Sequence, residues 1–208
     1  MKRTSRISLV ALALCMVLTL GASALAEEAL TESAPMSEWN GEWISVLPFL
    51  DDPAFVEAAG TMAEGVGMAG DELMDMFKSM FANDSIVAMN IEDTRITFLD
   101  APGGEAVAEV EYAPIDVVDL GGYMVSAYEA QGDADIRYLL LMPAEIDESG
   151  VMMSHFHMRY GSDLQEMSSE EKAMWYPTMV LSDTTVEQVI AGCEEFVAES
   201  FGGEEGAA

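Results

Sequence analysis

Short runs of alternating apolar and polar residues fill the stretch from residue 85 to residue 160, and they constrain the fold more than any other feature of the chain. Within one run, Val110 and Tyr112 alternate with Glu109 and Glu111. Successive side chains of a β-strand point to opposite faces, so such a run makes a wall with one buried face and one solvated face. A series of short strands joined by turns predicts an antiparallel meander that closes into a barrel or folds into a sandwich.

Turn signals rich in glycine, proline and serine separate several of the expected strands, as at 102–104, 121–122 and 149–150. Aromatic and β-branched residues predict an additional first strand over 39–46. The remaining expected strands cover residues 86–91, 95–98, 106–112, 123–128, 136–142 and 151–160.

Helices are expected before and after this β region, where apolar residues recur at helical spacing. A helical region follows the first strand, and its clearest part is 71–82. The apolar stripe of this helix consists of Leu73, Phe77, Met80 and Phe81. A C-terminal helix is expected after a cap at Ser182 or Asp183. Its stripe consists of Val186, Val189, Ile190, Cys193 and Val197. The chain is therefore expected to be mainly β with flanking helices.

The N-terminus has the pattern of a secretory signal peptide, expected over residues 1–26. Lys2, Arg3 and Arg6 precede an apolar run that is shorter than the roughly 20 residues needed to span a bilayer. The run ends in small residues, and Ala24-Leu25-Ala26 offers a cleavage site. We therefore expect an extracytoplasmic protein, periplasmic or secreted, with no membrane span in the mature chain.

Cys15 lies inside the apolar run after Leu14 rather than after a small residue, so a lipoprotein anchor is not expected. Cleavage leaves Cys193 as the only cysteine, which excludes an internal disulfide. The expected divisions of the mature chain are a flexible acidic leader over 27–37, a single domain over 38–201 and a frayed tail over 202–208.

The chain carries 38 acidic residues against eight Lys and Arg, a net charge of −30. Three of the basic residues lie in the expected signal peptide, so cleavage leaves five against 38, a net charge of −33. This charge makes nucleic acid and anionic membrane surfaces poor partners. It is typical of a highly soluble protein and it also concentrates cations, but charge alone does not select a metal site.

His155 and His157 are the only histidines of the chain, and Phe156 alone separates them. Residues two apart on a strand share a face and lie about 6.6 Å apart. Two imidazoles at this spacing can lean together and bind one zinc ion at about 2.0 to 2.1 Å. Zinc sites need further ligands, so the spacing alone fits a metal site as well as it fits two ordinary histidines of a barrel wall.

Several blocks of the chain, taken in order, resemble the ZinT (YodA-like) family of bacterial extracytoplasmic zinc-binding proteins. Residues 36–48 resemble the family's opening W-x-G-x-W-x-S-V-x-P, and Ser154-His155-Phe156-His157 resembles its H-F-H motif. These two blocks are the specific ones. The other similar blocks are Ile91-Glu92-Asp93, Ile96-Thr97-Phe98, Ile136-Arg137-Tyr138-Leu139, Trp175-Tyr176-Pro177 and Leu181-Ser182.

The resemblance implies a calycin, lipocalin-like antiparallel β-barrel that holds zinc at its mouth through His155, His157 and a third ligand. The family's third ligand is a histidine upstream of H-F-H, and this chain has none there. Glu145 is the nearest residue able to coordinate, and Asp147 and Glu148 are alternatives if the turn register shifts. Two histidines, one carboxylate and water form an acceptable zinc shell that selects less strongly for nitrogen-preferring metals.

A second departure concerns Cys193, which stands where the family's last helix often has a histidine. A thiolate would be a strong zinc ligand, but a place on the apolar stripe of a helix favours a buried, inert thiol.

The resemblance predicts an exported protein that captures or buffers zinc and hands it to a zinc-uptake solute-binding protein or transporter. Other divalent cations such as cadmium fit the same ligands. The alternative is a barrel with a degenerate metal site that binds a small apolar ligand, with Leu140, Met142 and Met153 as candidates to line its interior. An enzymatic role is not expected, because no H-E-x-x-H or G-x-S-x-G motif accompanies the histidines.

Overall fold

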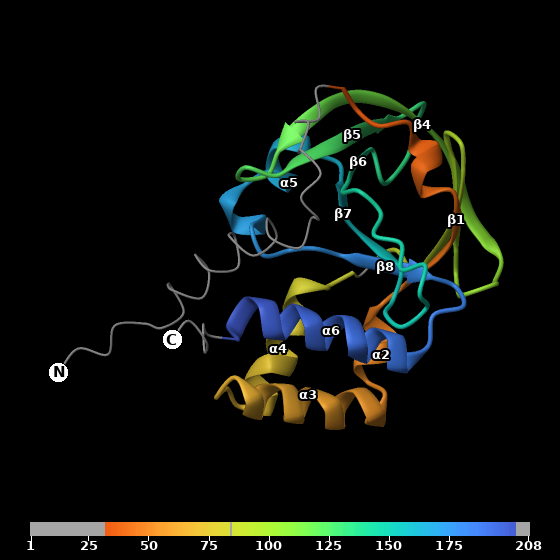
Figure 1. Cartoon of the computed structure of the whole chain (residues 1–208). Helices are drawn as coiled ribbons and strands as arrows, with labels where there is room; N and C mark the ends of the chain where they lie inside the picture. Colours follow the sequence, from red (N-terminus) through yellow and green to blue (C-terminus); the bar gives the residue numbers. More distant parts are fainter. Residues whose placement is uncertain (1–31, 84, 203–208) are drawn as a thin grey trace.

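In the computed structural model, which describes residues 32–83 and 85–202, eight antiparallel strands close into a barrel (Figure 1). Consecutive strands are neighbours and the last pairs with the first, so the closed sheet has no free edge. The strands are β1 (Gly41–Ser45), β2 (Ala88–Glu92), β3 (Arg95–Leu99), β4 (Ala106–Asp119), β5 (Met124–Ala130), β6 (Tyr138–Leu141), β7 (His155–Gly161) and β8 (Thr178–Leu181). The expected barrel is confirmed, and the sandwich is not formed.

The inner face of the barrel is identified by strand register. Trp43 lies opposite Met89, and Met89 lies opposite Phe98, so these three apolar side chains share one face. The other face of β1 and β2 carries the polar residues Glu42 and Asn90, and is therefore the outside. The buried interior cluster also contains Ile91, Ile96, Tyr112, Tyr128, Leu139, Leu141, Phe156, Met158 and Met179.

A short 3-10 helix, η1 (Met36–Trp39), precedes β1, and Trp39 of η1 and Trp43 of β1 both belong to the interior cluster. The indole N–H of Trp39 donates to the carbonyl of Met142 at 2.8 Å, and that of Trp43 donates to the carbonyl of Trp39 at 2.7 Å. Both buried indoles are thus hydrogen bonded, which removes the cost of burying their polar groups.

A layer of helices covers the outer face of the barrel on one side. Figure 1 shows α3, α4 and α6 together on that side, with β8 close to them. Ala127, Leu140 and Val180 point outward from the wall and are buried in one cluster with Phe77 and Val189 of the helices. The helices are α2 (Leu47–Leu50), α3 (Pro53–Gly65), α4 (Gly70–Met80), α5 (Leu164–Met167) and α6 (Val186–Phe201), with the 3-10 turn η2 (Glu170–Lys172).

The sequence did not predict β8. Its first three residues, Thr178, Met179 and Val180, are all fully buried, because the barrel interior covers one face and the helices cover the other. A strand buried on both faces loses the polar alternation that identifies strands in a sequence. β8 also begins directly after Pro177, and its residues resemble the segment that leads into the last helix in the family. The sequence therefore favoured a connecting segment here over a strand.

Two boundaries differ from expectation for local reasons. β4 continues through Pro114 to Asp119, and a register shift between Pro114 and Asp116 accommodates the missing N–H of the proline. The cap of α6 is Thr185 rather than Ser182 or Asp183. Its side chain accepts from Gln188 N while the Gln188 side chain accepts from Thr185 N, which forms a capping box.

The end of the expected flexible leader is packed against the barrel. The N–H of Ala34 donates to the hydroxyl of Ser126 at 2.9 Å, and Met36 is buried. The packed domain therefore begins before residue 38. The expected signal peptide and the tail beyond residue 202 lie outside the described residues. No helix within the described ranges has the length and apolar character required to cross a bilayer.

Replacement of Thr185 by Ala is expected to lower the free energy of unfolding by about 1 kcal/mol, because it leaves a backbone N–H at the start of α6 without its acceptor. Urea denaturation followed by tryptophan fluorescence measures the change. Asp183→Ala is the matched control, since that residue lies outside the capping box. A larger loss for Asp183→Ala than for Thr185→Ala would contradict the assignment of the cap.

Candidate metal site

The two histidines lie at the start of β7 and point out of the barrel. Phe156 between them is fully buried in the interior, where its ring packs edge-on against Trp43 at a centroid distance of 4.8 Å. Alternation then sends His155 and His157 to the outer face, opposite Val180 and Thr178 of β8. The two imidazole centroids are 5.0 Å apart, with the ring planes at 72°. The predicted sharing of one face by the pair is confirmed.

The pair was expected at the mouth of the barrel, and the structure places both rings on the outer face of the wall. The rings lie between the outer wall and the segments that cover it, at the end of the barrel where the β6–β7 connection crosses. Leu140, Met142 and Met153, candidates for the inner lining, are buried in the cluster that joins the wall to the helices. Both faces of β6 are apolar and buried, so its sequence did not reveal which face is the inner one.

Glu145 is held beside His155 by the backbone. Its N–H donates to the His155 carbonyl at 2.8 Å, and the N–H of His155 donates to the Glu145 carbonyl at 2.9 Å. A directly paired residue of an antiparallel bridge shares its partner's face. The Glu145 carboxylate oxygen Oε2 is 3.9 Å from His155 Nε2, with 71% of the Glu145 side chain and 15% of the His155 side chain exposed.

The carboxylate of Asp147 organises the turn that follows Glu145. It accepts hydrogen bonds from the Ser149 N–H and hydroxyl at 2.9 and 2.6 Å, and from the N–H groups of Val151 and Met152 at 2.8 and 2.6 Å. These bonds, that of the Ser149 hydroxyl first, lower the pKa of Asp147 to about 2. Asp147 is thus engaged in the turn, while Glu148 is exposed on it.

Cys193 is buried in the cluster between the barrel and α3, α4 and α6, with 1% of its surface exposed. Burial, and then the charge of Glu194, raise the pKa of its thiol to about 12. The thiol is therefore protonated at neutral pH, and it lacks the thiolate form that binds zinc.

Each histidine ring has one nitrogen next to an oxygen atom. Nδ1 of His157 lies 2.7 Å from the hydroxyl of Thr178, and Nδ1 of His155 lies 3.3 Å from the carbonyl of Met153. Burial, and then the charge of His155, lower the pKa of His157 to about 3. His157 is therefore neutral at pH 7. A metal ion can bind its free ring nitrogen without first removing a proton from the imidazole.

The residues present fit zinc as a preformed pair of ligands with a third within reach. Among the described residues, no three His, Cys, Asp or Glu side chains already stand close enough together to hold a metal ion. For Glu145 to complete such a set, its side chain would have to swing toward the histidines from its exposed position. Two nitrogens and one carboxylate oxygen leave a fourth position for water, a set that zinc accepts.

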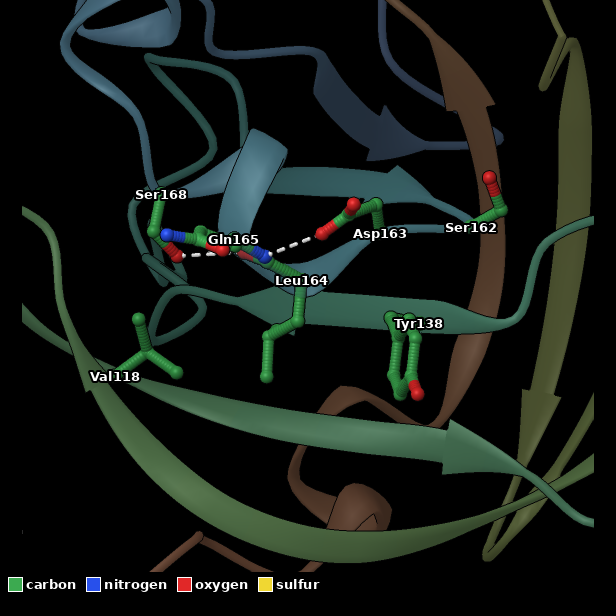
Figure 2. A pocket seen from close by; sticks show the side chains of 7 residues that line it. All are labelled: Val118, Tyr138, Ser162, Asp163, Leu164, Gln165 and Ser168. Carbon is green, nitrogen blue, oxygen red and sulfur yellow. Dashed lines mark hydrogen bonds between the residues drawn. The ribbon is translucent and has the colours of Figure 1, made fainter.

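A separate hollow of about 590 Å³ lies on the outer surface near α5 (Figure 2). Val118, Tyr138 and Leu164 form its apolar part, and Asp163 is its acidic side chain. The Asp163 carboxylate accepts from the N–H of Gln165 at 2.8 Å, so it caps α5. The hollow contains neither histidine and is not part of the candidate metal site.

Comparison with known proteins gives a family match, a curated relative and solved structures of similar fold. Residues 22–193 match the model of a family described as ZinT (YodA) periplasmic lipocalin-like zinc-recruitment. A probable metal-binding protein of Bacillus subtilis, YrpE, is 25% identical over 158 residues. The match covers 69% of this chain and 59% of that relative, so the chain spans less than two thirds of the relative's length.

Solved structures with the same fold include the Zn(II)-bound ZinT-like domain of Streptococcus pneumoniae AdcA. It superimposes with a TM-score of 0.62 and 21% identity, covering 81% of this chain and 94% of that domain. The Zn(II)-bound AdcA chain of the same organism gives the same TM-score and identity, covering 82% of this chain and 37% of AdcA. At this identity the likeness establishes a shared fold.

The Asp147 turn predicts a pH-dependent stability. A carboxylate whose pKa is lowered in the folded state stabilises the fold above its ordinary pKa of 3.8, and that contribution is lost as the pH falls toward about 2. Asp147→Asn should therefore destabilise the protein at pH 7, and the difference from the wild type should shrink between about pH 4 and pH 2. Urea titrations at several pH values measure it. Glu148→Gln is the control, and an equal effect of that change would contradict the role of Asp147.

Proposed function

Since the chain belongs to the ZinT family, we propose that it is an exported protein that captures or buffers zinc outside the cytoplasm. The observation that supports this most strongly is the pair His155 and His157, whose rings share the outer face of β7 with centroids 5.0 Å apart. Glu145 is proposed as the third ligand, because a backbone bridge holds it next to His155. Water completes the shell.

The proposed ligand set accounts for both capture and release. Zinc is cargo here rather than a resident cofactor, and a shell that includes water and an exposed carboxylate opens more easily than a closed four-ligand site. Glu145 brings oxygen where relatives are expected to use nitrogen, so other divalent cations such as cadmium should also bind. The net charge of −33 expected after cleavage raises the local concentration of cations near the site.

Export and delivery complete the proposal. The basic residues, the short apolar run and the Ala24-Leu25-Ala26 site support secretion, and the matched family is described as periplasmic. A ZinT-like domain forms part of the longer AdcA chain. We propose that this protein delivers zinc to an uptake system, either a solute-binding protein or a transporter.

We assign the chain a binding role and no catalytic one, in keeping with a family described by zinc recruitment. The alternative function, capture of an apolar ligand inside the barrel, has no support in the fold. Large buried side chains, including Trp43, Tyr112 and Tyr128, fill the interior.

The His155→Ala, His157→Ala double variant tests the proposal. Isothermal titration calorimetry of the purified protein should give about one zinc ion bound by the wild type and none by the double variant, because the remaining carboxylates cannot replace two imidazoles. Circular dichroism confirms that the variant keeps its fold. Absence of zinc binding by the intact wild type would overturn the proposed function.

Glu145→Gln tests the third ligand. Loss of an outer-shell partner usually weakens metal binding 10- to 100-fold, so loss of a direct ligand should weaken it by at least about tenfold. Glu148→Gln removes the same charge from the same exposed turn and serves as the matched control. Equal zinc affinities for the two variants, measured by competition with a chromogenic chelator, would remove Glu145 from the site and leave the histidine pair in place.

A further inference from the structure

We infer that Thr178 is a positioning residue of the metal site, because its buried hydroxyl determines which nitrogen of His157 carries the proton. The inference rests on the proposed zinc-binding function. Thr178 is the first residue of β8 and lies directly opposite His157 on the neighbouring strand. Its side chain therefore shares the outer face of the wall with the imidazole.

The direction of the hydrogen bonds follows from a group that can only accept. Thr178 Oγ1 lies 2.9 Å from the backbone carbonyl oxygen of Tyr176. A carbonyl has no proton, so the hydroxyl donates its single proton to it. The same hydroxyl oxygen lies 2.7 Å from Nδ1 of His157. Because its proton is already committed, this oxygen accepts from the Nδ1–H of His157.

The proton position has a direct consequence for metal binding. A neutral imidazole carries one proton, and with that proton on Nδ1 the lone pair is on Nε2. The same reasoning applies to His155, whose Nδ1 lies 3.3 Å from the carbonyl of Met153. Both rings thus present Nε2 as the metal-binding atom. For His155, this is the nitrogen 3.9 Å from the Glu145 carboxylate.

The surroundings of Thr178 hold its side chain in place and keep water from replacing the hydroxyl as a hydrogen-bond acceptor. Thr178 is 0% exposed, so water cannot replace the hydroxyl as an acceptor. Its carbonyl accepts from the N–H of Val46 at 3.1 Å, and the preceding carbonyl of Pro177 accepts from the N–H of Met158 at 2.9 Å. These main-chain bonds fix the backbone of Thr178 to two neighbouring segments of the barrel. The hydroxyl then orients the ring as outer-shell partners orient other metal-bound histidines.

Thr178→Val and Thr178→Ser test the inference as a pair. Valine keeps the shape of threonine and removes the hydroxyl, so the His157 proton should move to Nε2 and block the lone pair. Zinc affinity should fall by about 10- to 100-fold, as for other outer-shell partners. Serine keeps the hydroxyl and should bind zinc within a few-fold of the wild type. Chelator competition measures all three proteins, and circular dichroism checks their folding.

A second measurement needs no metal. The chain has only two histidines, so selective labelling of the imidazoles with ¹⁵N gives two sets of ring signals. Long-range ¹H–¹⁵N spectra of the metal-free wild type should show His157 protonated on Nδ1. The valine variant should shift this ring toward protonation on Nε2, and the serine variant should resemble the wild type. This measurement remains decisive for the wild type even if the valine variant does not fold.

The outcomes separate this inference from the proposed function. Protonation of wild-type His157 on Nε2, or wild-type zinc affinity in a folded valine variant, would overturn the role of Thr178 while zinc binding stands. Failure of the wild type to bind zinc would instead remove the proposed function, and the ring spectra would still report the tautomer of His157.

Discussion

The antiparallel pairing of β7 with both of its neighbours is the constraint on which the site depends. A slip of one residue would exchange the two faces of a strand. The observed register keeps Phe156 and Met158 in the interior cluster and sends His155 and His157 to the outer face. One register therefore determines both the packing of the barrel interior and the placement of the two proposed metal ligands.

The sequence predicts the barrel better than it predicts the surroundings of the site. Side-chain periodicity was enough to predict the strand β4 and the shared face of His155 and His157. The sequence does not show which face of β6 is the inner one, because Leu139, Leu140 and Leu141 are all apolar and buried, with the interior on one side and the helices on the other. The role of Thr178 could not be predicted from the sequence for the same reason, because Thr178 lies in β8, a strand that is buried on both faces. Glu145 is proposed as the third ligand from the family resemblance, because no sequence pattern of its own distinguishes it from the other acidic residues of the chain.

A buried arginine connects the site to the segment between β7 and β8. Arg159 continues the outward face of β7 and donates to the carbonyls of Trp175, Met167 and Ala173 at 3.0, 2.7 and 3.4 Å. Its guanidinium also lies 5.0 Å from the centre of the Tyr176 ring. A buried cation is tolerated only where its donors find acceptors, so these bonds fix the segment that leads to Thr178.

The backbone bridge between Glu145 and His155 holds the proposed third ligand in place without using its side chain. Main-chain atoms alone make the bridge, while the Glu145 side chain extends into solvent. With Glu145 as the proposed third ligand, substitution at this position would change how tightly, and how selectively, a metal is held without disturbing the barrel. Natural variation at position 145 would then let descendants of this protein adapt to different metal supplies, with the scaffold as a constant.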